Sequence, residues 1–127
     1  MKYLIDSYAW IEYLDGSIKG EKVKQILNSS SDIYSINLSL TEVVSRVRRE
    51  NKDSEVAYQA IISNSRVLDI SPELAKLAGL FHATMRSTIK DFGIVDSLLY
   101  TLARHLSAKI VTGDKHFKNM KNVIFLE

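Results

Sequence analysis

Four carboxylate side chains stand at positions from which they could act together on a cation or a phosphate. Asp6 and Asp114 each follow a short run of β-branched or aromatic residues, and Glu42 and Asp96 stand in the first turn of segments with helical periodicity. In an open parallel sheet, ligands bind beyond the carboxyl ends of the strands, where the following helices begin. We therefore expect these four acids, although distant in sequence, to converge at one edge of a sheet.

Charge repulsion determines what such a cluster would need. Two carboxylates about 4 Å apart repel by around 4 kcal/mol at an effective dielectric of 20, so several in one place require a cation. Oxygen ligands of this hardness favour Mg²⁺ or Mn²⁺ over zinc. The absence of cysteine excludes a thiol nucleophile and a cysteine-based zinc site. His82, His105 and His116 show no pairing signature, and we interpret them as surface or partly packed residues, which disfavours a histidine-based ribonuclease.

Each acid also has a purely structural interpretation. The three aspartates would serve as helix N-caps or complement a helix dipole. Glu42 would close a capping box begun by Ser39, or pair with Arg46 one helical turn later. Asp91, which precedes Gly93, is interpreted as a solvated turn residue. Each structural interpretation suffices for one acid, but four acids at four such positions favour a shared site.

The elements that must position these acids follow from the hydrophobic pattern. Short β-branched or aromatic runs predict strands, and apolar residues spaced i, i+3, i+4, i+7 predict helices between them. Strands separated by helical crossovers predict an α/β fold with three α/β/α layers around a mostly parallel five-stranded sheet, in one domain over residues 1–127. The predicted strands span residues 2–5, 33–36, 67–70, 109–112 and 123–126, and the predicted helices span residues 8–14, 21–27, 40–47, 55–63, 74–81 and 95–106.

Composition and charge agree with a folded protein that binds a polyanion. Hydrophobic residues make up 46% and charged residues 25%, and no apolar run approaches the roughly 20 residues of a membrane span, so a cytoplasmic location is expected. Setting the four acids aside leaves 17 basic against 11 acidic side chains, a basic surface around an acidic pocket. The basic residues near the acids are candidates for RNA binding, with an ordinary solvated surface as the alternative: Arg46, Arg48, Arg49, Lys52, Arg86, Lys90, Lys115 and Lys118.

The segments that carry the acids have a recognisable form. They are Tyr3-Leu4-Ile5-Asp6-Ser7, Leu40-Thr41-Glu42-Val43, Ile94-Val95-Asp96-Ser97 and Ile110-Val111-Thr112-Gly113-Asp114-Lys115-His116-Phe117. These segments resemble the four motifs of PIN-domain nucleases and, more narrowly, of VapC-type toxins of VapBC toxin–antitoxin pairs. The last, a strand followed by Thr-x-Asp-x-x-Phe, is the most specific. The resemblance covers essentially the whole chain, and none of the family's acids is missing.

This resemblance implies an endoribonuclease whose four acids form the catalytic metal site, with one or two Mg²⁺ or Mn²⁺ ions activating water. Hydrolysis of this kind leaves a 5′-phosphate and a 3′-hydroxyl. Ser7 and Thr112 would orient a carboxylate or a bound water, with ordinary turn hydrogen bonding as the alternative. RNA would be bound as a single strand or loop. The implied partners are a small antitoxin protein that blocks the acidic cleft and a second copy in a homodimer. A set of apolar residues could form the dimer face, although core packing is favoured for most of them: Trp10, Ile11, Leu14, Tyr58, Ile61 and Ile62.

Two other functions place acids at the same positions. A phosphotransfer or receiver domain also holds Mg²⁺ at strand ends, but this chain lacks the early acidic pair, and Asp69 is expected inside its strand. A catalytically idle scaffold that binds RNA or protein is the second alternative. Such a scaffold has no use for mutually repelling carboxylates, so the nuclease interpretation is preferred.

Overall fold

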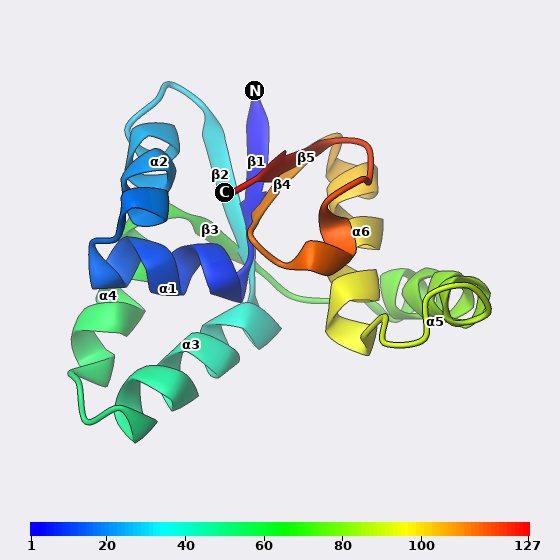
Figure 1. Cartoon of the computed structure of the whole chain (residues 1–127), viewed down its shortest axis with the longest axis horizontal. Coiled ribbons are helices and arrows are strands. Elements are labelled where there is room, and N and C mark those ends of the chain that lie inside the picture. The colour runs from blue at the N-terminus through cyan, green and yellow to red at the C-terminus, as the bar shows by residue number, and fades with distance from the viewer.

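Five short strands lie side by side at the centre of the protein, which is described here by a computed structural model of residues 1–127 (Figure 1). Their order across the sheet is β3-β2-β1-β4-β5, and every neighbouring pair is parallel. The predicted five-stranded sheet is therefore confirmed, and it is parallel throughout. The strands are β1 (Lys2–Ile5), β2 (Asp32–Ile36), β3 (Arg66–Leu68), β4 (Lys109–Thr112) and β5 (Val123–Phe125).

Six α-helices cover the two faces of the sheet. Helices α1 to α4 lie on one face and α5 and α6 on the other (Figure 1), so the predicted α/β/α layering is confirmed. A short 3-10 helix, η1, follows β4. The helices are α1 (Ser7–Asp15), α2 (Ile18–Leu27), α3 (Asn37–Arg49), α4 (Ser54–Asn64), α5 (Pro72–Arg86), α6 (Ile94–Leu106) and η1 (Lys115–Phe117).

The central strands are buried on both sides, which explains their nearly continuous apolar sequences. Ile5 and Val111 point into the core beneath α1 to α4. Their neighbours Leu4 and Ile110 point into the second core, beneath α5 and α6. Successive side chains of a strand alternate between faces, so β1 and β4 bring both cores together along the middle of the sheet.

A chain of buried polar groups fixes α1 against the sheet. The indole nitrogen of the fully buried Trp10 donates a hydrogen bond to Ser35 Oγ in β2 at 2.9 Å. Ser35 in turn contacts the hydroxyl of Ser65 at 2.9 Å, and Ser65 donates to the carbonyl of Ile61 at 2.7 Å. Buried polar groups are nearly always paired in this way. These hydrogen bonds fix the positions of α1, β2 and the end of α4 relative to one another.

Two predictions about element boundaries are wrong. Helix α3 begins at Asn37, so Ser39 lies inside it and cannot begin a capping box. Glu42 consequently lies in the second turn of α3, not the first. Strand β3 ends at Leu68, so Asp69 follows the strand instead of lying within it. Strand β3 pairs with β2 over three residues only, because β2 ends at Ile36 and α3 begins at the next residue.

The six apolar residues considered for a dimer face divide between core and surface. Trp10, Ile11 and Ile61 belong to the core beneath α1 to α4, as favoured. Tyr58 and Ile62 on α4 remain 38% and 40% exposed. None of the helices combines the length and apolar character that a membrane-spanning segment requires.

Candidate active site

The middle of the sheet positions two of the four acids side by side. Asp6 directly follows β1, and Asp114 lies two residues beyond the end of the adjacent β4. The backbone N–H of Asp6 donates to the carbonyl of Val111 at 3.2 Å, which holds the two strand ends together. From β1 the chain passes through α1 and α2 to β2, which lies on one side of β1, whereas β4 lies on the other side and is reached from α6. In open α/β sheets, ligands bind at such a point, where the strand order reverses.

Each aspartate also caps a helix. Asp6 Oδ1 accepts a hydrogen bond from the N–H of Ala9 at 2.8 Å, and Asp114 Oδ1 accepts from the N–H of His116 at 2.9 Å. Asp96 Oδ2 accepts from the N–H of Gly93 at 3.1 Å. The structural interpretation of the aspartates is therefore correct. It does not compete with a shared site, because capping fixes each side chain through one oxygen.

Glu42 reaches the same region from α3. Neither structural alternative applies to it, since the capping box is absent and Arg46 pairs with Glu50 at 3.3 Å instead. The pKa of Glu42 is raised by partial burial and by repulsion from Asp96, while a hydrogen bond from the Ser7 hydroxyl lowers it. Glu42 thus belongs electrostatically with the aspartates.

One cleft of about 830 Å³ contains all four carboxylates. Asp6 and Asp114 enter it from the strand ends, Glu42 from the layer of α1 to α4, and Asp96 from the opposite layer. The acids that lie far apart in sequence are therefore neighbours in space. The other residues that line the cleft are Ser7, Tyr8, Ile11, Thr41, Val43, Ser45, Arg46, Arg49, Val95, Leu99, Gly113 and Lys115.

Three of the four carboxylates of the cleft, those of Asp6, Glu42 and Asp96, resist ionisation. Burial raises the pKa of Asp6 to about 7; hydrogen bonds from Thr112 and Ala9 oppose this rise, and repulsion by Asp114 and Asp96 adds to it. Burial also raises the pKa of Asp96, with repulsion from Asp114 adding to the effect. A desolvated group of like charges favours protonation or a bound cation. The cleft therefore suits a positively charged ligand.

Thr112 connects the two strand-end acids. Its side chain is fully buried at the end of β4. Its Oγ1 accepts a hydrogen bond from the N–H of Asp114 at 2.9 Å, and its hydroxyl hydrogen-bonds the Asp6 carboxylate, which lowers the pKa of that acid. Thr112 thus makes a carboxylate-orienting contact together with an ordinary turn hydrogen bond, so the two interpretations describe the same side chain.

Gly113 was not identified from the sequence, although it lies between Thr112 and Asp114. The ring of Tyr8 packs so closely on this glycine that an added Cβ would overlap ring atoms Cε1 and Cζ. The Tyr8 hydroxyl accepts a hydrogen bond from Lys19 at 2.8 Å, which holds the ring in place. The position of Gly113 inside the Thr-x-Asp motif is the only feature of the sequence that indicates this close contact with Tyr8.

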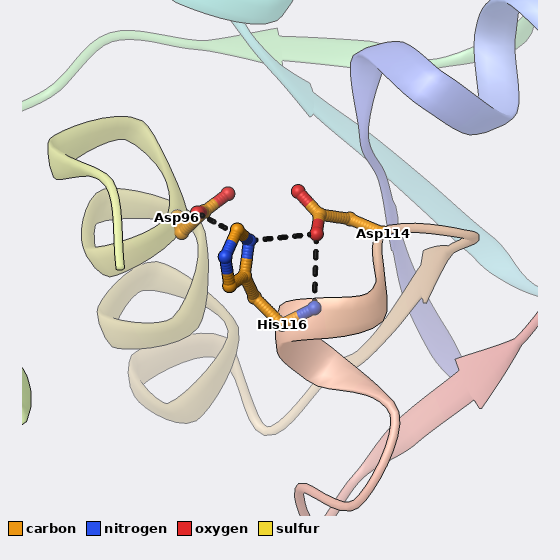
Figure 2. Close-up of side chains that lie close together, drawn as sticks. All are labelled: Asp96, Asp114 and His116. Atoms are coloured by element: carbon orange, nitrogen blue, oxygen red, sulfur yellow. Dashed lines mark hydrogen bonds and ion pairs between the residues drawn. The ribbon is translucent and has the colours of Figure 1, made fainter. Parts of the chain in front are cut away.

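His116 is partly packed, as expected, but its position beside two acids of the cleft was not foreseen from the sequence. Its Nδ1 lies 2.9 Å from Asp114 Oδ1 and 3.7 Å from Asp96 Oδ2 (Figure 2). The side chain is 22% exposed and packs edge-on against Phe92. The spacing Asp114-x-His116 could have indicated this contact. Asp114 caps η1, and the first turn of η1 brings the His116 ring next to the capping carboxylate. His82 contacts the Phe92 carbonyl at 3.0 Å and His105 is exposed, so both agree with the prediction.

The predicted RNA-binding residues divide into two groups. Arg46, Arg49 and Lys115 line the acidic cleft. Arg86, at the end of α5, and Lys90, in the following loop, are exposed and do not line it. The cleft thus has cationic side chains beside its carboxylates.

Asp69 and Asp91 are two acids that do not line the cleft. Asp69 is exposed and accepts a hydrogen bond from the Asn37 amide at 3.1 Å. Although Asp69 follows a strand, it does not line the acidic cleft as a phosphoacceptor would. Asp91 is exposed in the turn before α6, as predicted.

The donor set of the cleft fits a divalent cation. Asp96, Asp114 and His116 each offer one ligand atom, and these atoms lie within 4.8 Å of one another. His116 Nδ1 is buried and forms no hydrogen bond, although it lies within ion-pair distance of Asp114. A nitrogen in this position is stabilised by an ion pair with the carboxylates when the ring is protonated, or by a cation that the three side chains share.

Comparison with protein families adds independent information. Residues 3–123 match the model of the PIN domain. This chain belongs to the PIN-domain family. The match includes the ends of β1 and β4 and the acidic cleft between them. Among curated protein sequences, none matches this PIN domain.

Solved structures resemble this PIN domain over almost its entire length. A toxin–antitoxin complex from Klebsiella pneumoniae aligns with a TM-score of 0.76 and 16% identity, covering 98% of each chain. VapBC2 from Rickettsia felis, bound to a DNA fragment from its promoter, aligns at 0.77 with 18% identity, covering 98% of this chain and 97% of that chain. VapC20 from Mycobacterium tuberculosis, a toxin that cleaves the sarcin–ricin loop, aligns at 0.74 with 16% identity, covering 95% and 96%. At such identities the likeness establishes the fold that this PIN domain shares with VapC toxins.

Proposed function

We propose that this PIN domain is a metal-dependent endoribonuclease that hydrolyses RNA phosphodiesters and acts as the toxin of a toxin–antitoxin pair. The observation that carries the proposal is the meeting of Asp6, Glu42, Asp96 and Asp114 in one cleft, where burial and mutual repulsion raise the pKa of three of them. A pocket that penalises its own negative charges this strongly is suited to holding Mg²⁺ or Mn²⁺.

The four carboxylates would hold one or two such ions. A divalent ion bound there supplies Lewis-acid polarisation of the phosphate and lowers the pKa of the attacking water. Thr112 fixes the orientation of Asp6 through its hydroxyl, and Ser7 does the same for Glu42. These contacts keep the acids in place before substrate arrives, which reduces the reorganisation needed during the reaction.

The border of the cleft would bind the RNA backbone. Arg46, Arg49 and Lys115 line the cleft beside the acids and can neutralise phosphates that flank the scissile bond. The expected substrate is a single-stranded or looped segment, because the deep major groove of duplex RNA excludes side chains. The likeness to an RNA-cleaving VapC toxin supports RNA as the substrate class.

Partners are part of the proposal. The structural neighbours that are complexes of toxin and antitoxin support a small antitoxin as partner. From the family resemblance, this antitoxin would block the acidic cleft. A homodimer is proposed from the family resemblance, and the exposed Tyr58 and Ile62 of α4 are available to such a contact.

The decisive experiment is the substitution Asp96→Asn, with Asp91→Asn as the matched control. Asp96 lines the cleft, whereas Asp91 is an exposed acid only five residues away in sequence. We expect Asp96→Asn to reduce RNA cleavage more than about 100-fold while RNA binding, measured by fluorescence anisotropy, is retained. The control variant should cleave like the native protein. Equal cleavage by both variants would contradict the proposal and favour a scaffold that only binds RNA.

The ends of the products test the chemistry separately. Attack by water leaves a 5′-phosphate, whereas attack by the neighbouring 2′-hydroxyl of the RNA leaves a 2′,3′-cyclic phosphate. Because His116 lies beside Asp114, this second route has a candidate general base next to the acids of the cleft. A cyclic phosphate product would replace the metal-dependent mechanism with one centred on this histidine.

A further inference from the structure

One nitrogen atom next to the acids of the cleft has no role in the function proposed above. His116 Nδ1 is shielded from solvent, lacks a hydrogen-bond partner and lies between the carboxylates of Asp96 and Asp114 (Figure 2). Asp96 comes from α6, whereas Asp114 and His116 come from the turn after β4, so two segments distant in sequence converge on one point. A buried polar atom without a partner requires an explanation.

Hydrogen bonding within the cluster does not supply that explanation. Asp114 Oδ1 already accepts a hydrogen bond from the backbone N–H of His116 at 2.9 Å. The imidazole nitrogen lies 2.9 Å from the same oxygen, which is an ion pair when the ring is protonated, but the contact does not form a hydrogen bond. The second carboxylate oxygen, on Asp96, lies 3.7 Å away, beyond hydrogen-bond range. The ring therefore stands near two acceptors without donating to either.

The distances suit ligands of a single ion. Two ligand atoms each about 2.1 Å from a cation and at right angles to one another are separated by about 3 Å, and wider bond angles increase this separation. The nitrogen–oxygen separations of 2.9 Å and 3.7 Å fall in this range. Neutral imidazole coordinates through an unprotonated nitrogen, and such a nitrogen would have no hydrogen to donate to the neighbouring carboxylates.

We propose that His116 is a nitrogen ligand to a divalent ion that it shares with Asp96 and Asp114, and that this nitrogen makes the site select a first-row transition ion such as Mn²⁺ over Mg²⁺. The inference rests on the proposed function only in placing the ion in the same cleft. Imidazole suits transition ions, whereas Mg²⁺ prefers carboxylate, carbonyl and water oxygens. A cleft of acids alone offers much less basis for this discrimination.

The experiment uses the full chain and Mn²⁺ or Mg²⁺ as the probe. Pulsed electron paramagnetic resonance of bound Mn²⁺ detects the magnetic coupling of a directly bonded ¹⁴N nucleus. We expect this coupling in the native chain, its loss in His116→Gln, and its retention in the control His105→Gln, which alters an exposed histidine outside the cleft. Calorimetric titration should show Mn²⁺ affinity falling about tenfold or more in His116→Gln, with Mg²⁺ affinity changed less than about threefold.

A second measurement does not depend on any variant folding correctly. In native protein labelled with ¹⁵N only at histidine, the ¹⁴N coupling should be replaced by that of ¹⁵N. Absence of nitrogen coupling in the native chain would overturn the proposal. An equal loss of affinity for both ions in His116→Gln would also overturn it, because His116 would then only position Asp114.

RNA cleavage by the native protein separates this inference from the proposed function. Nitrogen coupling without cleavage would contradict the nuclease and leave the histidine ligand standing. Cleavage without nitrogen coupling would support the nuclease and contradict the proposal that His116 is a metal ligand.

Discussion

Asp6 should make the metal-free protein less stable as the pH rises. The side chain is 4% exposed, and its pKa is raised from the ordinary value of 3.8 to about 7, chiefly by burial. In the unfolded chain the carboxyl ionises near 3.8, so between these two values only the folded state holds the proton. The stabilisation is complete below the lower value and is lost as the pH rises through the higher one.

The size of the effect follows from the pKa difference. Each pKa unit corresponds to about 1.4 kcal/mol, so ionising Asp6 costs the folded state about 4 kcal/mol in total. About 3 kcal/mol of this loss falls between roughly pH 5 and pH 8. Asp6→Asn removes the charge while keeping an oxygen that can cap α1 by accepting from Ala9. The variant should therefore gain stability relative to the native chain over this range.

Urea unfolding in the presence of a chelator measures the prediction at several pH values. Comparing Asp6→Asn with the native protein cancels most of the contribution of Glu42 and Asp96, whose pKa values are raised in the same direction. A stability difference between the two proteins that does not change with pH would refute the reasoning. So would a native protein that gains stability relative to the variant as the pH rises, because its Asp6 would then have a lowered pKa.

Two further substitutions test the packing of side chains. Ser35 lies in the core away from the carboxylates, and Gly113 lies next to Asp114. Ser35→Ala should lower the free energy of unfolding by about 1–3 kcal/mol in urea denaturation, because it leaves the buried Trp10 indole N–H without an acceptor, and cleavage should be unchanged. Gly113→Ala should lower the melting temperature and reduce cleavage about tenfold, because the added Cβ overlaps the Tyr8 ring. Gly79→Ala, an exposed helical position with open space around it, is its control and should be neutral or slightly stabilising. Similar behaviour of the two glycine variants would contradict this account.

The positions of the four acids could be predicted because they depend on sheet topology. Parallel strands place their carboxyl ends at one edge, so Asp6 and Asp114 meet once β1 and β4 are neighbours. Asp96 follows from the start of α6, which Gly93 marks. Glu42 was placed in the correct helix but one turn too early, because Ser39 imitates an N-cap while the chain already turns at Asn37.

Features that depend on single side-chain contacts could not be predicted. The three-residue η1 is too short to leave a periodic signal, and its turn is what returns His116 to Asp114. The packing of Tyr8 on Gly113 joins two segments whose spacing depends on the whole sheet. The end of β3 before Asp69 was missed because Ile70 continues the apolar pattern beyond the last strand pairing.

The two hydrophobic cores lie on opposite faces of the sheet, and the cleft is the place where side chains of both helical layers approach each other. Glu42 belongs to a helix of one layer and Asp96 to a helix of the other. A ligand that binds both carboxylates therefore connects the two helical layers directly, in addition to their contacts through the strands. A ligand bound in the cleft should then slow amide hydrogen exchange both in the first turns of α6 and in α3. Binding would thus reduce local opening in both helical layers.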